Sequence, residues 1–273
     1  MKRKPRRRSA KALQSHAELV LLRSELDELC GRLTKLLRKV MGLRGITRVA
    51  VLKALSRHDC LGCIIRELRH RANSRADAIY IEEHQFAVAS LVTELQEHLG
   101  SLASVKREVA TKYGRVDVLV SARGLRGENR TIVVEVKVGR SFKIEQILRY
   151  YMAFLDADIV VWRVKPKEVL VLRAEKARYL LSSFMRICIS RARRLIELLE
   201  QGIIPSCNHK PDTLKERDYH IPEDELERYA EALPGTLPDV VEKVAELLGI
   251  KLTTKDRVEP IITEGVRCWL YVI

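Results

Sequence analysis

The sequence predicts an α/β protein with a mixed sheet, preceded by an all-α N-terminal region and followed by a small C-terminal subdomain. Between residues 82 and 174, one helical pattern precedes three segments rich in β-branched residues, and a second helix leads to two further apolar segments. Residues 13–75 show helical periodicity alone. Helices that alternate with strands form layers on a sheet, because each element must bury its apolar face.

The first 75 residues divide into an arm and a helical region. Residues 1–12 are charged and carry Pro5, so we expect a basic disordered arm. Residues 13–75 contain a heptad seam from Leu19 to Val40, in which leucines recur at alternating spacings of three and four. Such a seam predicts either a homodimer through Leu19–Val40 or a helix packed on its neighbours in the same chain, with helices at about 46–57 and 61–72 as partners.

Residues 76–202 are expected to form the core. The pattern predicts a helix at 82–99, strands at 104–113, 115–122 and 130–138, a helix at 141–157, strands at 158–164 and 168–174, and a long basic helix at 176–201. Residues 203–273 are rich in proline and more acidic than basic, so we expect a small acidic subdomain that ends in a strand-like segment at 265–273.

Charge is distributed unevenly. Residues 1–75 hold 20 basic and 6 acidic residues, which accounts for the whole net charge of +14. A polyanion such as DNA is therefore the expected partner, with the N-terminal region as the contact. No apolar run is long enough to cross a membrane and no secretory signal precedes the helices, so we expect a cytoplasmic, nucleoid-associated protein. Only three Asn and five Gln occur, which favours a thermophilic source.

Three charged residues interrupt the best strands. Asp117 lies in the second strand, and Glu135 and Lys137 lie on one face of the third. An unpaired charge in a buried strand costs about 3 to 5 kcal/mol, so these groups must compensate one another or hold a cation. Two carboxylates suit Mg²⁺ or Mn²⁺, and a neighbouring lysine can orient a water molecule. A structural carboxylate–lysine pair at a sheet edge is the alternative.

The spacing of these residues resembles that of the PD-(D/E)XK, or restriction-endonuclease-like, nucleases. Asp117 is followed after seventeen residues by Glu135-Val136-Lys137, although Val116 stands where the family has proline. The resemblance extends over about residues 80–175 to RecB-like members, including archaeal endonucleases. Those members carry a glutamate on the preceding helix and a glutamine and tyrosine four residues apart on the following one. This chain has Glu82-Glu83, and Gln146 with Tyr150, at the corresponding places.

The resemblance implies an αβββαβ core and a Mg²⁺-dependent deoxyribonuclease, with an endonuclease favoured over an exonuclease. Asp117, Glu135 and the carbonyl of Val136 would bind Mg²⁺ (or Mn²⁺), with Glu83 completing the ligand set. Lys137 would position a metal-bound water for in-line attack on the phosphodiester. Gln146 and Tyr150 would steady the site. The alternative function is a catalytically inactive nucleic-acid-binding or scaffold protein that retains the fold.

Several other groups are candidate binding sites. Lys112 and Arg115 lie near Asp117 in sequence and are expected to contact DNA phosphates. The basic helix carries Arg186, Arg191, Arg193 and Arg194, which either face DNA or are solvated. Cys60 and Cys63 form a single CxxC flanked by His58 and His70, and a structural zinc site needs four ligands. Since no second CxxC follows, and Cys207-Asn-His209 with His220 is more typical of a surface loop, we expect no zinc site.

Overall fold

A six-stranded mixed sheet forms the centre of the molecule. The computed structural model describes residues 8–71, 78–123, 128–139, 144–208 and 230–252. The sheet order is β1-β2-β3-β4-β5-β6, so every strand is hydrogen-bonded to its neighbour in sequence. The strands span β1 (Ala103–Thr111), β2 (Gly114–Arg123), β3 (Asn129–Lys137), β4 (Asp158–Arg163), β5 (Glu168–Leu172) and β6 (Glu231–Pro234). The α/β class with a mixed sheet is thereby confirmed.

The sheet mixes parallel and antiparallel pairs. Strands β1, β2 and β3 form an antiparallel meander. Helix α5 (Ile144–Ala153) then carries the chain to β4, which runs parallel to β3. A parallel neighbour requires such a crossover, whereas β5 and β6 each pair antiparallel with the strand before them. The order α4-β1-β2-β3-α5-β4 is the order of elements that the sequence predicted.

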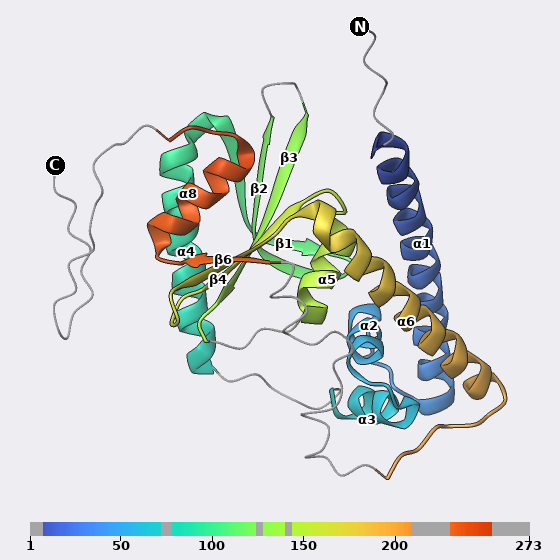
Figure 1. Cartoon of the computed structure of the whole chain (residues 1–273). Helices are drawn as coiled ribbons and strands as arrows, with labels where there is room; N and C mark the ends of the chain where they lie inside the picture. Colours follow the sequence, from blue (N-terminus) through green and yellow to red (C-terminus); the bar gives the residue numbers. More distant parts are fainter. Residues whose placement is uncertain (1–7, 72–77, 124–127, 140–143, 209–229, 253–273) are drawn as a thin grey trace, which may run out of the picture.

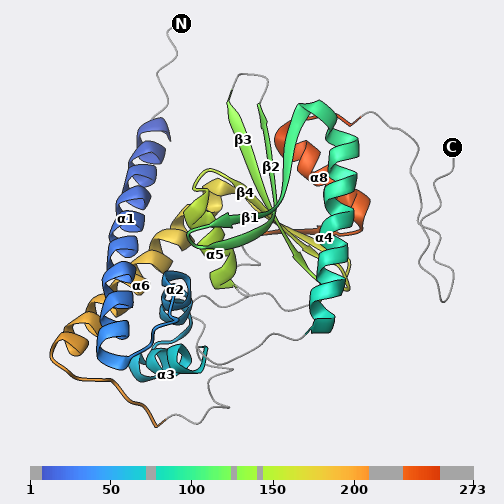
Figure 2. The same ribbon diagram turned by 180° about the vertical axis from the view of Figure 1, so that it is seen from behind.

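Helices cover both faces of the sheet (Figures 1 and 2). Helices α4 (Ala78–Leu99) and α8 (Leu237–Leu248) bury one face, against Val118, Val134 and Val136. On the other face, α5 and the long helix α6 (Ala174–Glu200) pack with the N-terminal helices. Val134 and Val136 of β3 pack against α4 and α8, whereas Val133 packs on the opposite face of the sheet. This alternation is expected for a strand that is buried on both faces.

The N-terminal helices share their core with α6. They span α1 (Arg8–Met41), α2 (Arg48–Arg57, capped by Thr47) and α3 (Leu61–Arg71). Helix α1 begins at Arg8, so residues 8–12 of the expected arm are helical. Leu19, Leu26 and Leu33 of the heptad seam are at most 1% exposed and lie in the cluster that contains α6. The seam therefore packs within the chain, which is the second of the two alternatives.

Part of the C-terminal region belongs to the same sheet. Strand β6 pairs with β5, and α8 packs against α4, β3 and β4. A boundary at residue 203 therefore does not separate β6 and α8 from the core. A side chain at Gly235 would meet the backbone of Glu168 within 2.6 Å, so glycine is required where β6 turns into α8. The expected strand at 265–273 lies outside the described residues. Among the described helices, none combines the length and apolarity needed to cross a membrane.

Candidate active site at the fork of β2 and β3

The candidate active site lies where β2 and β3 part. Their pairing reaches Val118 opposite Val134 and stops there. The next step of the same register places Asp117 opposite Glu135, so both carboxylates project from one face at the opening of a fork. Beyond it, β2 remains paired with β1 as far as Gly114, and β3 remains paired with β4 as far as Lys137.

An irregularity in β1 accompanies the fork. Glu108 occupies the position opposite Asp117 in the β1–β2 register, and its φ of 50° is unusual for a residue with a side chain. Val116, beside Asp117, packs with the layer of α1 and α6, whereas Val118 packs with α4 and α8. Val116 and Val118 thus pack into different layers, at the point where the pairing of β2 with β3 ends.

Asp117 fills the space left by the missing ladder bonds. Its Oδ2 accepts a hydrogen bond of 2.9 Å from the Val136 amide and lies 3.2 Å from His84 Nε2. The amide and carbonyl of one strand residue point to the same edge, so the Val136 carbonyl also faces the fork. Asp117 therefore lies beside the backbone oxygen that the sequence resemblance implied as a ligand.

Glu135 is almost completely buried, with 1% of its side chain exposed. Its Oε1 accepts hydrogen bonds from Lys137 Nζ and, at 2.5 Å, from Gln146 Nε2. Its Oε2 receives no hydrogen bond from a donor group among the described residues, and the Glu135 side chain lies within hydrogen-bonding reach of the Asp117 carboxylate. A buried carboxylate oxygen without a donor is costly, since desolvation is not repaid by a hydrogen bond. This oxygen is thus available to a cation.

The pKa values of the two carboxyl groups, Asp117 and Glu135, are shifted in opposite directions. Burial, together with the nearby charge of Asp117, raises the pKa of Glu135 to about 8. For Asp117, burial opposes ionisation, but the hydrogen bonds from His84 and from the Val136 amide outweigh it and lower its pKa. The bond to Asp117 in turn raises the pKa of His84. Two carboxyl groups with divergent pKa values in one site are typical of functional centres.

Helix α5 contributes two polar side chains, Gln146 and Tyr150, to the site. Lys137 Nζ donates to Gln146 Oε1 over 3.1 Å, and Gln146 Nε2 contacts the Tyr150 hydroxyl. Gln146 and Tyr150 are four residues apart and lie on one helical face, which explains why one helix reaches the site twice. Five of the predicted site residues are therefore adjacent in space, listed along the chain as Asp117, Glu135, Lys137, Gln146 and Tyr150.

The helix residue that contacts the site is His84, and Glu83 does not contact it. Glu83 has 47% of its side chain exposed and pairs with Lys165 at 3.0 Å. His84 instead points toward Asp117. The helical periodicity contained this signal, because His84 lies four residues before Val88 and extends the buried stripe of Val88 and Leu91. The sequence resemblance directed attention to the two glutamates alone, so His84 was missed.

The residues present fit a divalent cation. Asp117, Glu135 and the Val136 carbonyl offer the oxygen ligands that Mg²⁺ and Mn²⁺ prefer, and Glu135 Oε2 lacks a donor within the described chain. A cation would also relieve the repulsion that raises the pKa of Glu135. Glu83, which is paired elsewhere, is not in a position to complete this ligand set in the present conformation.

The two residues expected to contact DNA phosphates are both exposed and paired with acids. Lys112, at the tip of the β1–β2 hairpin, bonds Asp27 of α1 at 2.5 Å. Arg115 lies 3.7 Å from Glu108. Tyr113 also donates to Asp27, so α1 holds the hairpin tip. Exposed pairs of this kind contribute at most about 1 kcal/mol, and a phosphate can compete for these cations.

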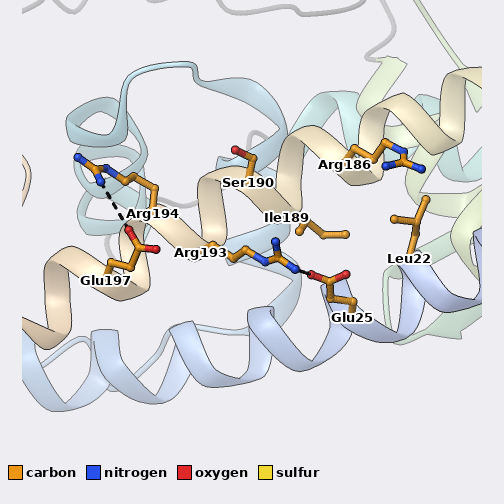
Figure 3. Close-up of a pocket in the computed structure, with 8 residues that line it drawn as sticks. All are labelled: Leu22, Glu25, Arg186, Ile189, Ser190, Arg193, Arg194 and Glu197. Atoms are coloured by element: carbon orange, nitrogen blue, oxygen red, sulfur yellow. Dashed lines mark hydrogen bonds and ion pairs between the residues drawn. The ribbon is translucent and has the colours of Figure 1, made fainter.

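The basic helix α6 directs three of its four candidate arginines onto α1 and α2. Arg191 is 8% exposed and donates to the Leu55 carbonyl and to Asp59. Arg193 pairs with Glu25 across a groove between α1 and α6, and Arg194 pairs with Glu197 along α6 (Figure 3). Arg186 pairs with Glu18. Arg186, Arg191 and Arg193 thus contact other elements, whereas Arg194 pairs within α6, so the prediction that these arginines face DNA gains no support from their contacts.

Three cysteines that form no zinc-binding pattern in the sequence lie together in the structure. Cys60, Cys63 and Cys207 offer sulfur atoms that all lie within 4.8 Å of one another. His58 contacts Glu67, and His209, His220 and Cys268 lie outside the described residues. Cys207 is 144 residues from Cys63, so no local spacing could have predicted this cluster.

Comparison of the chain with protein-family models, with curated proteins and with solved structures finds no significant match in any of the three.

Proposed function

We propose that this chain is a metal-dependent nuclease that hydrolyses DNA phosphodiester bonds at the Asp117–Glu135 fork, on a restriction-endonuclease-like core. The observation that carries the proposal is the meeting of two carboxylates with Lys137, at a point where Glu135 Oε2 has no donor among the described residues. A purely structural ion pair would use both carboxylate oxygens, since an unmet buried oxygen only destabilises the fold.

The proposed site divides its work between metal ligands and the groups that orient them. Asp117, Glu135 and the Val136 carbonyl hold Mg²⁺ or Mn²⁺. When bound, such a cation lowers the pKa of a water and offsets negative charge on the phosphoryl group. His84 donates to Asp117 Oδ2 and fixes the orientation of that carboxylate.

Lys137 is the group that handles the attacking water. Its ammonium is held between Glu135 Oε1 and Gln146 Oε1, and its third proton remains to orient the water toward phosphorus. The water oxygen bonds to phosphorus as the bond from phosphorus to the leaving oxygen breaks; the proton that the water loses passes to solvent, and the leaving oxygen takes a proton from solvent. Tyr150 keeps Gln146 in place through the Gln146 amide.

The proposal is tested by cleavage of labelled single-stranded, duplex, flap and four-way-junction DNA, with Mg²⁺, Mn²⁺ or EDTA. We expect metal-dependent cleavage by the wild-type protein and none by Asp117→Ala or Glu135→Ala. Glu97→Ala is the matched control, because it removes an exposed carboxylate elsewhere on α4. Salt-sensitive DNA binding without cleavage of any substrate would support the non-catalytic alternative and contradict the nuclease.

A further inference from the structure

Three thiols converge at the start of α3. Cys60 lies directly before α3, Cys63 lies in its first turn, and Cys207 lies in the segment that follows α6. The Sγ atoms of Cys63 and Cys207 are 3.2 Å apart, far beyond the ~2.05 Å of a disulfide bond. In a tetrahedral zinc site with Zn–S bonds of about 2.3 Å, sulfur atoms are about 3.8 Å apart. The cluster is therefore close to the dimensions of a zinc site.

The backbone of the segment after α6 lies directly against Gly62 of α3. An added Cβ at Gly62 would lie 2.5 Å from the carbonyl carbon of Ser206 and 2.7 Å from the amide of Cys207. Only glycine at position 62 thus allows the segment after α6 to lie against α3. Gly62 lies between the two cysteines of the CxxC, so the close approach of Ser206 and Cys207 to Gly62 also brings Cys207 to Cys60 and Cys63.

A cationic group and a helix end lie beside the cluster, although burial and the neighbouring thiols raise the pKa of Cys63 to about 12 in the metal-free chain. Arg66 donates to Cys63 Sγ over 3.7 Å, and the amino end of α3, at Cys60 and Cys63, carries the positive end of the helix dipole. Cys63 is 1% exposed. Three thiols crowded into one cluster repel one another when they ionise together, unless a cation lies among them.

We propose that Cys60, Cys63 and Cys207 supply three of the four ligands of one zinc ion, which fastens the segment after α6 to the N-terminal helices. Three thiolates select a soft or borderline cation such as Zn²⁺ and disfavour Mg²⁺. The site is structural: it lies between α3 and residues 203–208, and it ties the path from α6 toward β6 to the N-terminal region. This proposal does not depend on the nuclease function.

The test is metal analysis of the untagged, full-length, reduced protein, followed by replacement with Co²⁺. We expect one zinc per chain, retained in the presence of excess Mg²⁺, and an ultraviolet charge-transfer band from thiolate to Co²⁺. Cys60→Ser, Cys63→Ser and Cys207→Ser should each lower that band by about a third, because each removes one of three thiolates. Cys207→His should keep the metal with an altered spectrum, which separates loss of a ligand from loss of folding.

The matched control is Cys188→Ser, which makes the same chemical change at a buried thiol outside the cluster and should leave the metal content unchanged. Gly62→Ala should lower zinc retention without removing any ligand. A purified chain that binds neither Zn²⁺ nor Co²⁺ would overturn the proposal. So would full metal content in all three serine variants, or a Cys63–Cys207 disulfide in protein prepared with zinc.

Discussion

At the scale of single residues, His84 distinguishes this site from the pattern that its sequence suggested. His84 contacts Asp117, whereas Glu83 is half-exposed and pairs with Lys165. We therefore expect His84→Ala to reduce cleavage roughly tenfold or more, because Asp117 loses a hydrogen bond that fixes its orientation. Glu83→Ala should leave cleavage within about twofold of the wild type, since exposed ion pairs contribute little. Steady-state cleavage rates at saturating Mg²⁺ measure both.

Glu82→Ala is the control for these variants, as it removes an exposed charge from the same turn. A large loss in Glu83→Ala with little loss in His84→Ala would contradict this arrangement, and would place the glutamate in the working site.

Lys137 and Lys165 offer a second comparison. Lys137 is 21% exposed and contacts Glu135 and Gln146, whereas Lys165 is 62% exposed and contacts Glu83. If Lys137 orients the attacking water, Lys137→Ala should lower kcat by about 10²- to 10⁴-fold while DNA binding stays nearly intact. Lys165→Ala should change neither value by more than about twofold. Equal losses in both variants would mean that the lysines act only through their charge.

The pKa of Glu135 predicts how the metal-free protein responds to pH. It lies at about 8 in the folded chain against an ordinary 4.5. Between these values the folded state keeps a proton that the unfolded state releases. The free energy of unfolding therefore falls as pH rises through this interval, on the order of 3 to 5 kcal/mol in total.

Glu135→Gln has no group to titrate at this position, so its stability in EDTA should decline less over the same interval. Urea unfolding at several pH values between 4.5 and 8 measures the difference. If the free energy of unfolding depended on pH in the same way for both proteins, the raised pKa of Glu135 would be contradicted.

The resemblance named most of these residues, and the fixed periods of strands and helices explain why they lie close together. Glu135 and Lys137 share a face through the two-residue repeat of a strand, and Gln146 and Tyr150 share one through the four-residue step of a helix. The partner on α4 was missed because both glutamates flank the buried stripe. His84, four residues before the buried Val88, continues that stripe and faces the sheet, so the periodicity of α4 carried the signal that the resemblance did not use.

At the scale of elements, the fork lies beside an irregularity in the backbone of β1. The φ of 50° at Glu108 is costly for a residue with a Cβ, by about 1 to 2 kcal/mol, and glycine adopts it readily. We expect Glu108→Gly to be neutral or stabilising by up to about 1 kcal/mol. Arg107→Gly, at the neighbouring exposed and regular strand position, should destabilise by about 1 kcal/mol. Thermal unfolding in parallel measures both, and similar losses would contradict the strained conformation.

The strands and the crossover were predictable as elements, but the extent of the sheet was not. Strands β1 to β5 are rich in β-branched residues, whereas β6 is four residues long and ends in Pro234. Its place beside β5 arises from long-range pairing. For the same reason the heptad seam could not reveal its partner: the pattern fixes which side of α1 is apolar, and α6 covers that side only in the folded chain.

At the scale of the whole molecule, the N-terminal helices are part of the core. Removing residues 1–75 would expose the apolar face of α6, so that deletion is not a clean test of DNA binding. Removing residues 1–7 is cleaner, because these residues precede α1 and carry five basic side chains. We expect weaker DNA binding and a shallower dependence of log K on log salt, by up to about 0.9 for each phosphate that the truncated chain no longer neutralises. The melting temperature should not change.

An unchanged salt slope for the truncated chain would exclude residues 1–7 from the DNA interface. The charge imbalance predicts that residues 1–75, which hold the whole net charge, are the region that contacts DNA. It did not predict that Arg186, Arg191 and Arg193 of α6 would pair with acids or backbone carbonyls. Composition counts charges, and only the fold determines which of them are already neutralised.

The most direct test of the central claim is the rate of DNA cleavage as Mg²⁺ is titrated into the wild-type protein and into Glu135→Gln. Glu135 Oε2 lies beside Asp117 and accepts no hydrogen bond from the described residues. If this oxygen holds the cation, wild-type cleavage rises from zero to saturation and the variant, which keeps the shape of the side chain, stays inactive at every Mg²⁺ concentration. Equal cleavage by both proteins, or cleavage in EDTA, would contradict it.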